Sequence, residues 1–155
     1  MDIKELQCIF YDFDGVMTDN RVIVDQDGKE SVCVSRGDGY GVGIIRKLGI
    51  PQIIVSTEVN PVVERRGEKL NIPVIHGVSD KAVIVKKYCE ENGYDPLKTM
   101  FMGNDLNDLP AFDIVGFTAA PHDAEPEVLE RADWISSKNG GYGAVRELAR
   151  YLSQE

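Results

Sequence analysis

The stretch from Cys8 to Asn20, CIFYDFDGVMTDN, decides the fold because its apolar run ends in two aspartates one residue apart. A short apolar run that stops at polar residues is typical of a buried strand. Asp12 and Asp14 then stand just beyond the end of that strand, and Gly15 gives the backbone room to turn. Because like charges so close together repel each other, the pair predicts a bound cation or a catalytic use.

The rest of the 155-residue chain alternates short β-rich apolar runs with longer helix-like segments. QIIVS (52–56) is followed by NPVVERRGEKLN (60–71), and TMFMG (99–103) is followed by LNDLPAFD (106–113). Such alternation predicts βαβ units, and therefore a Rossmann-like α/β fold: a three-layer αβα sandwich with a mostly parallel sheet. The length fits one domain, which we expect to span residues 1–155.

One segment departs from this alternation. RVIVDQDGKESVCVS (21–35) contains two stretches of period-2 alternation around Asp27-Gly28. An Asp-Gly pair tolerates the positive φ angles of a tight hairpin turn. The segment therefore predicts a β-hairpin that projects from the sheet.

The composition excludes several classes of partner. A formal net charge of −9 opposes binding to nucleic acid or to anionic membranes. Three cysteines, without C-x-x-C spacing, indicate neither a disulfide framework nor a zinc site. No apolar run approaches membrane-spanning length, and the N-terminal MDIKEL has no apolar region, so we expect a cytoplasmic protein.

Polar side chains also stand where the other predicted strands meet helices. Ligands of open α/β sheets bind beyond the carboxyl ends of the strands. Carboxylates, a hydroxyl and an ammonium group at that edge would suit Mg²⁺ with a phosphate beside it. Taken singly, each motif has a simpler explanation: a helix N-cap, a surface lysine or a turn. Besides Asp12 and Asp14, the candidates are Ser56, Thr57, Glu58, Asp80, Lys81, Asn104, Asp105 and Asp108.

Taken together, these motifs resemble a known family. DFDGVMTD (12–19), the Ser56 junction, Lys81 and GNDLND (103–108) resemble the four motifs of the haloacid dehalogenase (HAD) superfamily of aspartate-nucleophile phosphohydrolases. The resemblance implies an HAD-like fold. Only the hairpin and one helix separate the first two motifs, and one helix and one short strand separate the next two, so we expect no cap domain. Because an uncovered site would be open to water, we expect a homo-oligomer in which a neighbouring subunit covers it.

The resemblance also implies a role for each catalytic residue. Asp12 would be the nucleophile that forms an aspartyl-phosphate, and Asp14 the general acid and base. Ser56 would hydrogen-bond the phosphoryl group, and Lys81 would offset its charge. These roles make the chain a phosphatase in which positioning and charge neutralisation supply most of the catalysis.

The same resemblance implies Mg²⁺ as the cofactor. Its ligands would be the Asp12 carboxylate, the Asp14 backbone carbonyl and a residue of the fourth motif. The family usually has aspartate directly after the glycine of that motif, whereas this chain has Asn104. An amide oxygen can coordinate with less charge, and Asp105 is the alternative ligand. Thr57 likewise replaces a usual glycine.

Within the superfamily, the chain resembles the capless sugar-acid phosphatases and the related domain of some acylneuraminate cytidylyltransferases. The resemblance is carried by the hairpin, by GDGYG (37–41) and by GGYGAVRE (140–147). Members are typically tetramers in which the hairpin and the C-terminal tail reach the adjacent subunit's active site. We therefore expect a tetramer, and Arg146 in the tail as a substrate-binding residue.

The substrate is expected to be a 2-keto-3-deoxy sugar-acid phosphate. Phosphatases for the octulosonate 8-phosphate usually have arginine where this chain has Glu58, whereas those for nine-carbon 9-phosphates resemble this chain in having glutamate, with Arg66 and Lys69 in the next helix. We therefore expect a nine-carbon, sialic-type 9-phosphate, with Thr57 also contacting the substrate. Arg66 and Lys69 would pair with the sugar carboxylate, since the helix is expected to begin at Ser56.

Three alternatives stay open. Arg66 and Lys69 are spaced as on an ordinary solvated helix face, where local glutamates would pair with them. The substrate could be 3-deoxy-D-manno-octulosonate 8-phosphate instead. The chain could also be a weakly active phosphatase-like module retained for assembly, as in the cytidylyltransferases.

Overall fold

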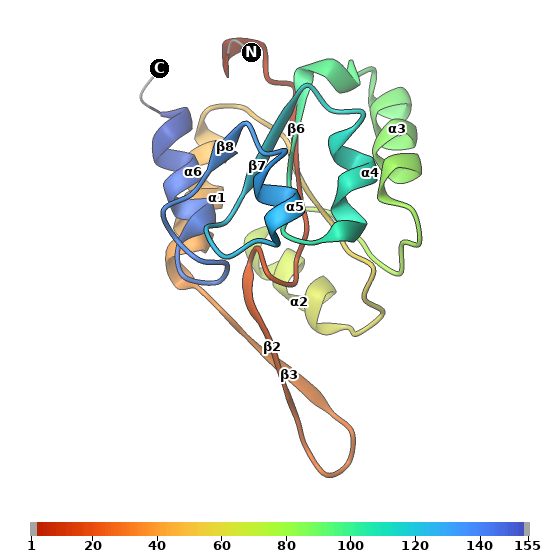
Figure 1. Ribbon diagram of the computed structural model, residues 1–155, viewed down its shortest axis with the longest axis vertical. Coiled ribbons are helices and arrows are strands. Elements are labelled where there is room, and N and C mark those ends of the chain that lie inside the picture. Colours follow the sequence, from red (N-terminus) through yellow and green to blue (C-terminus); the bar gives the residue numbers. More distant parts are fainter. Residues whose placement is uncertain (1–2, 154–155) are drawn as a thin grey trace.

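The computed structural model describes residues 3–153 and confirms the predicted α/β sandwich (Figure 1). Six parallel strands form one sheet in the order β5-β4-β1-β6-β7-β8. The strands are β1 (Cys8–Tyr11), β4 (Gln52–Val55), β5 (Val74–Ile75), β6 (Thr99–Met102), β7 (Phe117–Ala120) and β8 (Trp134–Ile135). The helices are α1 (Arg36–Lys47), α2 (Val62–Leu70), α3 (Lys81–Asn92), α4 (Leu109–Phe112), α5 (Pro126–Leu129) and α6 (Ala144–Leu152). Short 3₁₀ helices are η1 (Ile3–Glu5), η2 (Pro96–Lys98) and η3 (Leu106–Asp108).

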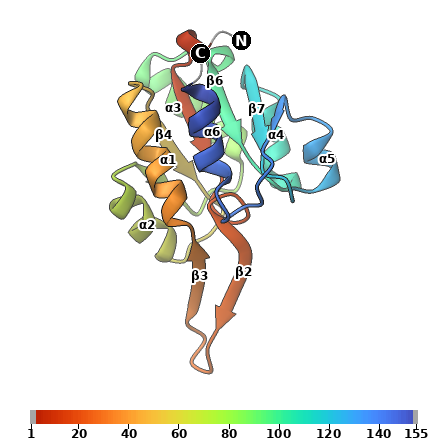
Figure 2. The same ribbon diagram turned by 90° about the vertical axis from the view of Figure 1, so that its left-hand side faces the viewer.

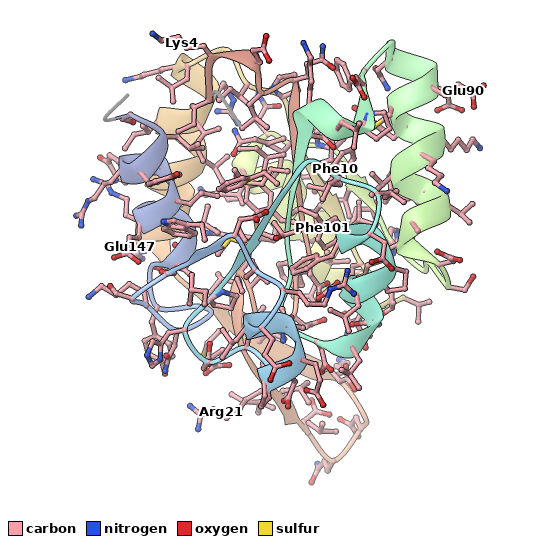
Figure 3. All side chains as sticks on the ribbon, turned by 45° about the horizontal axis from the view of Figure 1, so that its top comes forward. Lys4, Phe10, Arg21, Glu90, Phe101 and Glu147 are labelled. Atoms are coloured by element: carbon pink, nitrogen blue, oxygen red, sulfur yellow. The ribbon has the colours of Figure 1, made fainter. Side chains whose placement is uncertain are left out.

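The alternation of side chains along β1 builds the three layers. Ile9 and Tyr11 enter the apolar cluster under α1, α2 and α6, while Cys8 and Phe10 enter the cluster under α3, α4 and α5. All of these side chains are fully buried, as expected for a central parallel strand covered on both faces. Figure 3 shows Phe10 beside Phe101 in the interior, whereas Glu90 points outward from α3.

The predicted hairpin is confirmed. β2 (Thr18–Val24) pairs antiparallel with β3 (Glu30–Val34), and Gly28 in the turn has a φ of 78°. The ribbon extends away from the sheet (Figure 2). Its side chains Val22, Ile23 and Val24 are exposed. No helix among residues 3–153 has the length and apolarity needed to cross a bilayer.

The register of β1 places the site. Phe10 pairs with Ile53 of β4 on one side and with Phe101 of β6 on the other. Because all six strands run in one direction, their carboxyl ends meet at the same edge of the sheet. The loops after β1, β4 and β6 therefore lie next to one another at the root of the hairpin.

Candidate active site

Asp12 lies at the carboxyl end of β1 and is 6% exposed. Its Oδ1 accepts hydrogen bonds from the backbone N–H of Phe13 at 2.7 Å and from Lys81 Nζ at 2.7 Å. Burial raises the pKa of Asp12 to about 7, and the charge of Asp108 adds to this while Lys81 opposes it. A divalent cation beside this carboxylate would favour its ionised form.

Lys81 is the first residue of α3 and is 1% exposed, so the alternative of a surface lysine is wrong. Its Nζ lies 2.7 Å from Asp12 Oδ1 and 2.6 Å from Asp108 Oδ1. Burial opposes the charge on the ammonium group, but the two carboxylates outweigh it and raise the pKa of Lys81. The preceding Asp80 is the N-cap of α3, and its carboxylate accepts hydrogen bonds from the N–H groups of Ala82 and Val83. Asp80 is therefore a structural residue.

Asp108 is a member of the site to which the sequence assigned no role. It is fully buried, and its Oδ2 accepts hydrogen bonds from the N–H groups of Asn104 at 2.8 Å and Asp105 at 3.2 Å. One carboxylate thus fixes both Lys81 and the loop after β6. The signal was the spacing of Asp105 and Asp108, which form a capping box at η3.

The side chain of Asn104 fits the proposed cation. Its amide lies 2.8 Å from the backbone carbonyl of Asp14 and 3.1 Å from Asp12 Oδ2. With the amide nitrogen toward them, Asn104 donates a hydrogen bond to each. With the amide oxygen toward them, that oxygen lies within about 3 Å of both the carbonyl and the carboxylate oxygen. One carboxylate, one carbonyl and one amide oxygen form a set that Mg²⁺ accepts. Residues 3–153 contain no group of three or more His, Cys, Asp or Glu side chains placed to hold a metal ion, so this set depends on the Asp14 carbonyl and the Asn104 amide.

Asp105, the alternative ligand, lines the cavity beside Asp12, but its carboxylate caps η3 by accepting a hydrogen bond from the N–H of Leu106 at 2.7 Å. Asn104 is therefore the fourth-motif side chain that reaches Asp12 and Asp14.

Asp14 is half-buried at the mouth of the site. Burial raises the pKa of its carboxyl group and nearby Glu58 adds to this, whereas Lys81 and a hydrogen bond with Thr18 lower it. Thr18 is fully buried and also accepts a hydrogen bond from the N–H of Gly15 at 3.1 Å. The raised pKa favours the protonated form of Asp14, which an acid catalyst needs.

Ser56 follows β4 and is 1% exposed, and its Oγ accepts a hydrogen bond from the N–H of Glu58 at 3.1 Å. The expectation that a helix begins at Ser56 is wrong: α2 begins at Val62. The reason is Asn60, whose Oδ1 accepts a hydrogen bond from the N–H of Val62 at 3.0 Å, followed by Pro61 at the N-cap. The helix-capping explanation for Ser56 is therefore excluded as well.

A cavity of about 250 Å³ lies beside Asp12. Asn60 Nδ2 donates a hydrogen bond to Glu30 Oε2 at 3.2 Å, which ties the hairpin to the loop after β4 and makes it a wall of the cavity. Arg21 lies at the foot of the hairpin with its side chain pointing outward (Figure 3). The lining residues are Asp12, Asp14, Asn20, Arg21, Val22, Glu30, Val32, Thr57, Glu58, Asn60, Val62, Asn104, Asp105 and Asn107.

Arg66, Lys69 and Arg146 do not line this cavity. Arg66 and Lys69 line a separate groove between α1 and α2, where Arg66 Nη2 donates a hydrogen bond to the carbonyl of Ser35 at 3.0 Å. The guanidinium group of Arg146 lies 5.4 Å from the ring centre of Tyr40. The side chains of Arg66 and Lys69 therefore lie on the side of α2 next to α1. Within one chain, these three residues are not brought to the site.

The C-terminal segment 140–143 packs on its own chain, since the N–H of Gly141 donates to the carbonyl of Val16 at 3.1 Å. The following α6 packs along α1, where a Cβ on Gly41 would lie 2.8 Å from the Cα of Arg146. The structure therefore places this segment next to the site of its own chain, and the reach of the tail to a neighbouring subunit stays a prediction.

Comparisons with known proteins agree on one family. A family model described as haloacid dehalogenase-like hydrolase matches residues 57–148. The chain is 30% identical to the 3-deoxy-D-manno-octulosonate 8-phosphate phosphatase of Escherichia coli K12 over 150 residues, covering 96% of this chain and 80% of that protein.

Two solved structures extend this similarity. The same phosphatase from Moraxella catarrhalis, in complex with magnesium, phosphate and KDO, has a TM-score of 0.93 at 27% identity, over 98% of this chain and 88% of that one. An HAD-family protein from Streptomyces avermitilis has a TM-score of 0.94 at 44% identity, over 96% of this chain and 86% of that one.

Proposed function

Because the chain belongs to the haloacid dehalogenase-like hydrolase family and is a phosphoric monoester hydrolase, we propose that it dephosphorylates a 2-keto-3-deoxy sugar-acid phosphate. The observation that supports the eight-carbon ester, 3-deoxy-D-manno-octulosonate 8-phosphate, is the similarity to phosphatases of that ester over nearly the whole chain. This substrate replaces the nine-carbon ester as the first one to test.

In the proposed reaction, a carboxylate oxygen of Asp12 attacks phosphorus and the ester oxygen leaves with the bonding electrons. Asp14 donates its proton to that oxygen, which releases the sugar acid. Asp14 then accepts a proton from water as the water oxygen attacks phosphorus, which frees phosphate and regenerates Asp12. Lys81 and Ser56 bind the non-bridging oxygens of the phosphoryl group throughout.

Divalent metal is the cofactor at the level of the family, and we propose Mg²⁺ held by Asp12, the Asp14 carbonyl and Asn104. When bound, the ion offsets the negative charge of Asp12 and of the phosphoryl group. Two residues hold Asn104 in place for the ion. Asp108 fixes the backbone of Asn104, and Gly15 leaves room for its side chain, since a Cβ at Gly15 would lie 2.0 Å from Asn104 Nδ2.

The charge of the cavity supports a shared site. Lys81 and the proposed Mg²⁺ offset the phosphate of the proposed substrate, but its carboxylate would enter a cavity whose lining is dominated by carboxylates. Arg21 is the cation among the lining residues, and it already pairs with Asp19 at 3.2 Å. Cations from elsewhere would relieve this repulsion. We propose a homo-oligomer, a tetramer, in which Arg66, Lys69 and Arg146 of one subunit face the cavity of another.

A subunit-mixing experiment tests this arrangement. One kind of subunit carries Asp12→Asn, which removes the nucleophile of its own site. The other kind carries Arg66→Met, which removes the cation that it would supply to a neighbour's site. Co-assembled subunits should recover part of the wild-type activity, whereas activity no higher than the sum of the separate variants would contradict a shared site.

A nine-carbon 9-phosphate remains a second candidate because Glu58 lines the cavity, where its carboxylate could accept hydrogen bonds from additional hydroxyls. Release of phosphate from both esters, with and without Mg²⁺, separates the candidates. The main proposal predicts the higher kcat/KM on the eight-carbon ester with Mg²⁺. Absence of turnover on both would favour the assembly module instead.

A further inference from the structure

The glycine segment 140–141 lies directly on the loop that carries Asp14. A Cβ on Gly140 would lie 1.8 Å from the carbonyl oxygen of Gly15 and 3.0 Å from that of Thr18. A Cβ on Gly141 would lie 2.5 Å from the backbone nitrogen of Asp19. Since these neighbours are backbone atoms, a side chain at either glycine would push the loop out of place.

The opposite side of the same loop rests on Asn104. A Cβ on Gly15 would lie 2.0 Å from Asn104 Nδ2, so Gly15 has a backbone neighbour on one side and the proposed metal ligand on the other. Gly140 thus contacts Gly15, and Gly15 contacts Asn104; we call this row of three residues the stack. The position of the Asp14 carbonyl relative to Asn104 therefore depends on where Gly140 is held.

Asp123 holds Gly140. Its Oδ1 accepts a hydrogen bond from the N–H of Gly140 at 2.8 Å. Asp123 belongs to the loop after β7, and the N–H of Glu125 in that loop donates to the carbonyl of Asn104 at 2.9 Å. One loop thus fixes both ends of the stack, Gly140 through a side chain and Asn104 through the backbone.

We propose that Asp123 is a positioning residue that, through Gly140, sets the distance between the Asp14 carbonyl and Asn104 and so prepares the cation site. The inference rests on the proposed metal ligands. Asp123 is itself exposed and does not line the cavity, so it acts through Gly140 and not on substrate. Loss of an outer partner of this kind typically weakens metal binding about 10- to 100-fold.

The test compares Asp123→Ala with Asp123→Asn, whose amide oxygen can still accept the Gly140 hydrogen bond. The matched control is Asp95→Ala, which removes another exposed aspartate that caps a turn, by accepting from the N–H of Leu97 at 3.0 Å. Binding of Mg²⁺ to the intact protein is measured by calorimetry, and amide hydrogen exchange is measured at residues 15–18.

Asp123→Ala should weaken Mg²⁺ binding about tenfold and accelerate exchange at residues 15–18, while Asp123→Asn stays close to wild type. Asp95→Ala should change neither quantity even if it lowers stability. Unchanged exchange at residues 15–18 in Asp123→Ala would overturn the proposal. If the wild type binds no Mg²⁺, the proposed metal site fails, and the exchange measurement still decides whether Asp123 positions the loop.

Discussion

The change Lys81→Met should destabilise the protein strongly, and more so at higher pH. Nζ of Lys81 is 2.7 Å from one buried carboxylate and 2.6 Å from a second, and the lysine is 1% exposed. Removing one partner of a buried charge pair costs about 3–5 kcal/mol because the remaining charge is left unpaired. Methionine keeps the apolar stem, so nearly all of the cost is electrostatic.

The pH dependence follows from the direction of the pKa shifts. Burial and Asp108 raise the pKa of Asp12, and Lys81 opposes that rise. Without Lys81 the folded-state pKa rises further, so the folded protein binds a proton more tightly than the unfolded chain. That stability is present below the unfolded pKa and is lost as the pH rises through the folded pKa. Because the pKa of Asp12 is about 7 in the wild type and higher in the variant, the difference between their free energies of unfolding should widen as the pH rises above about 7.

Urea denaturation without metal measures this difference as the change in the free energy of unfolding. Lys87→Met on the same helix is the control, since Lys87 and Glu91 form an exposed pair at 3.8 Å and its loss should cost no more than about 1 kcal/mol. A cost for Lys81→Met as small as that of the control, or one that does not change with pH, would refute the reasoning.

Three further predictions concern the cation and the substrate. Burial and Asp108 raise the pKa of Asp12, so Mg²⁺ must displace a proton from this carboxyl group at low pH. Added Mg²⁺ should therefore raise the melting temperature more near pH 8 than near pH 5, because tighter binding to the folded state stabilises it more. Equal shifts at the two pH values would contradict this. Asn104→Asp should tighten Mg²⁺ binding in calorimetry and lower the stability of the metal-free protein, and weaker binding would argue against Asn104 as a ligand. Glu58→Arg should shift the ratio of kcat/KM further toward the eight-carbon ester, and an unchanged ratio would remove Glu58 as a specificity residue.

The fold could be predicted because its signals are local. Apolar runs such as Cys8–Tyr11 are bounded by polar residues, and Asp27-Gly28 marks the hairpin turn. Ser56 has the character of a helix N-cap and so predicts too early a start for α2. Asn60-Pro61 carries the stronger signal, which is an amide cap followed by a residue with a fixed φ.

Most residues of the site could also be predicted from the sequence, because parallel strands bring their carboxyl ends together at one edge of the sheet. Asp12, Asp14 and Asn104 meet as the strand order requires. The bridge from Lys81 to Asp108 could not be predicted, since it depends on the burial of a lysine that local sequence presents as a surface residue.

The directions in which the side chains of α2 point could not be predicted from the sequence either. Arg66 and Lys69 have the spacing of a paired binding face, but only the packing of α2 against α1 shows that they face away from the cavity of their own chain. In the same way, the glycines of 140–143 indicated a tail motif without indicating that it rests on the loop of Asp14.

The most direct test of the central proposal is acid-quenched turnover of 3-deoxy-D-manno-octulosonate 8-phosphate with Mg²⁺, followed by mass spectrometry of the peptide that contains Asp12. A transient phosphate adduct on Asp12, absent from Asp12→Asn, is the predicted result. Phosphate release without any adduct on that peptide, or equal release by Asp12→Asn, would contradict Asp12 as the nucleophile.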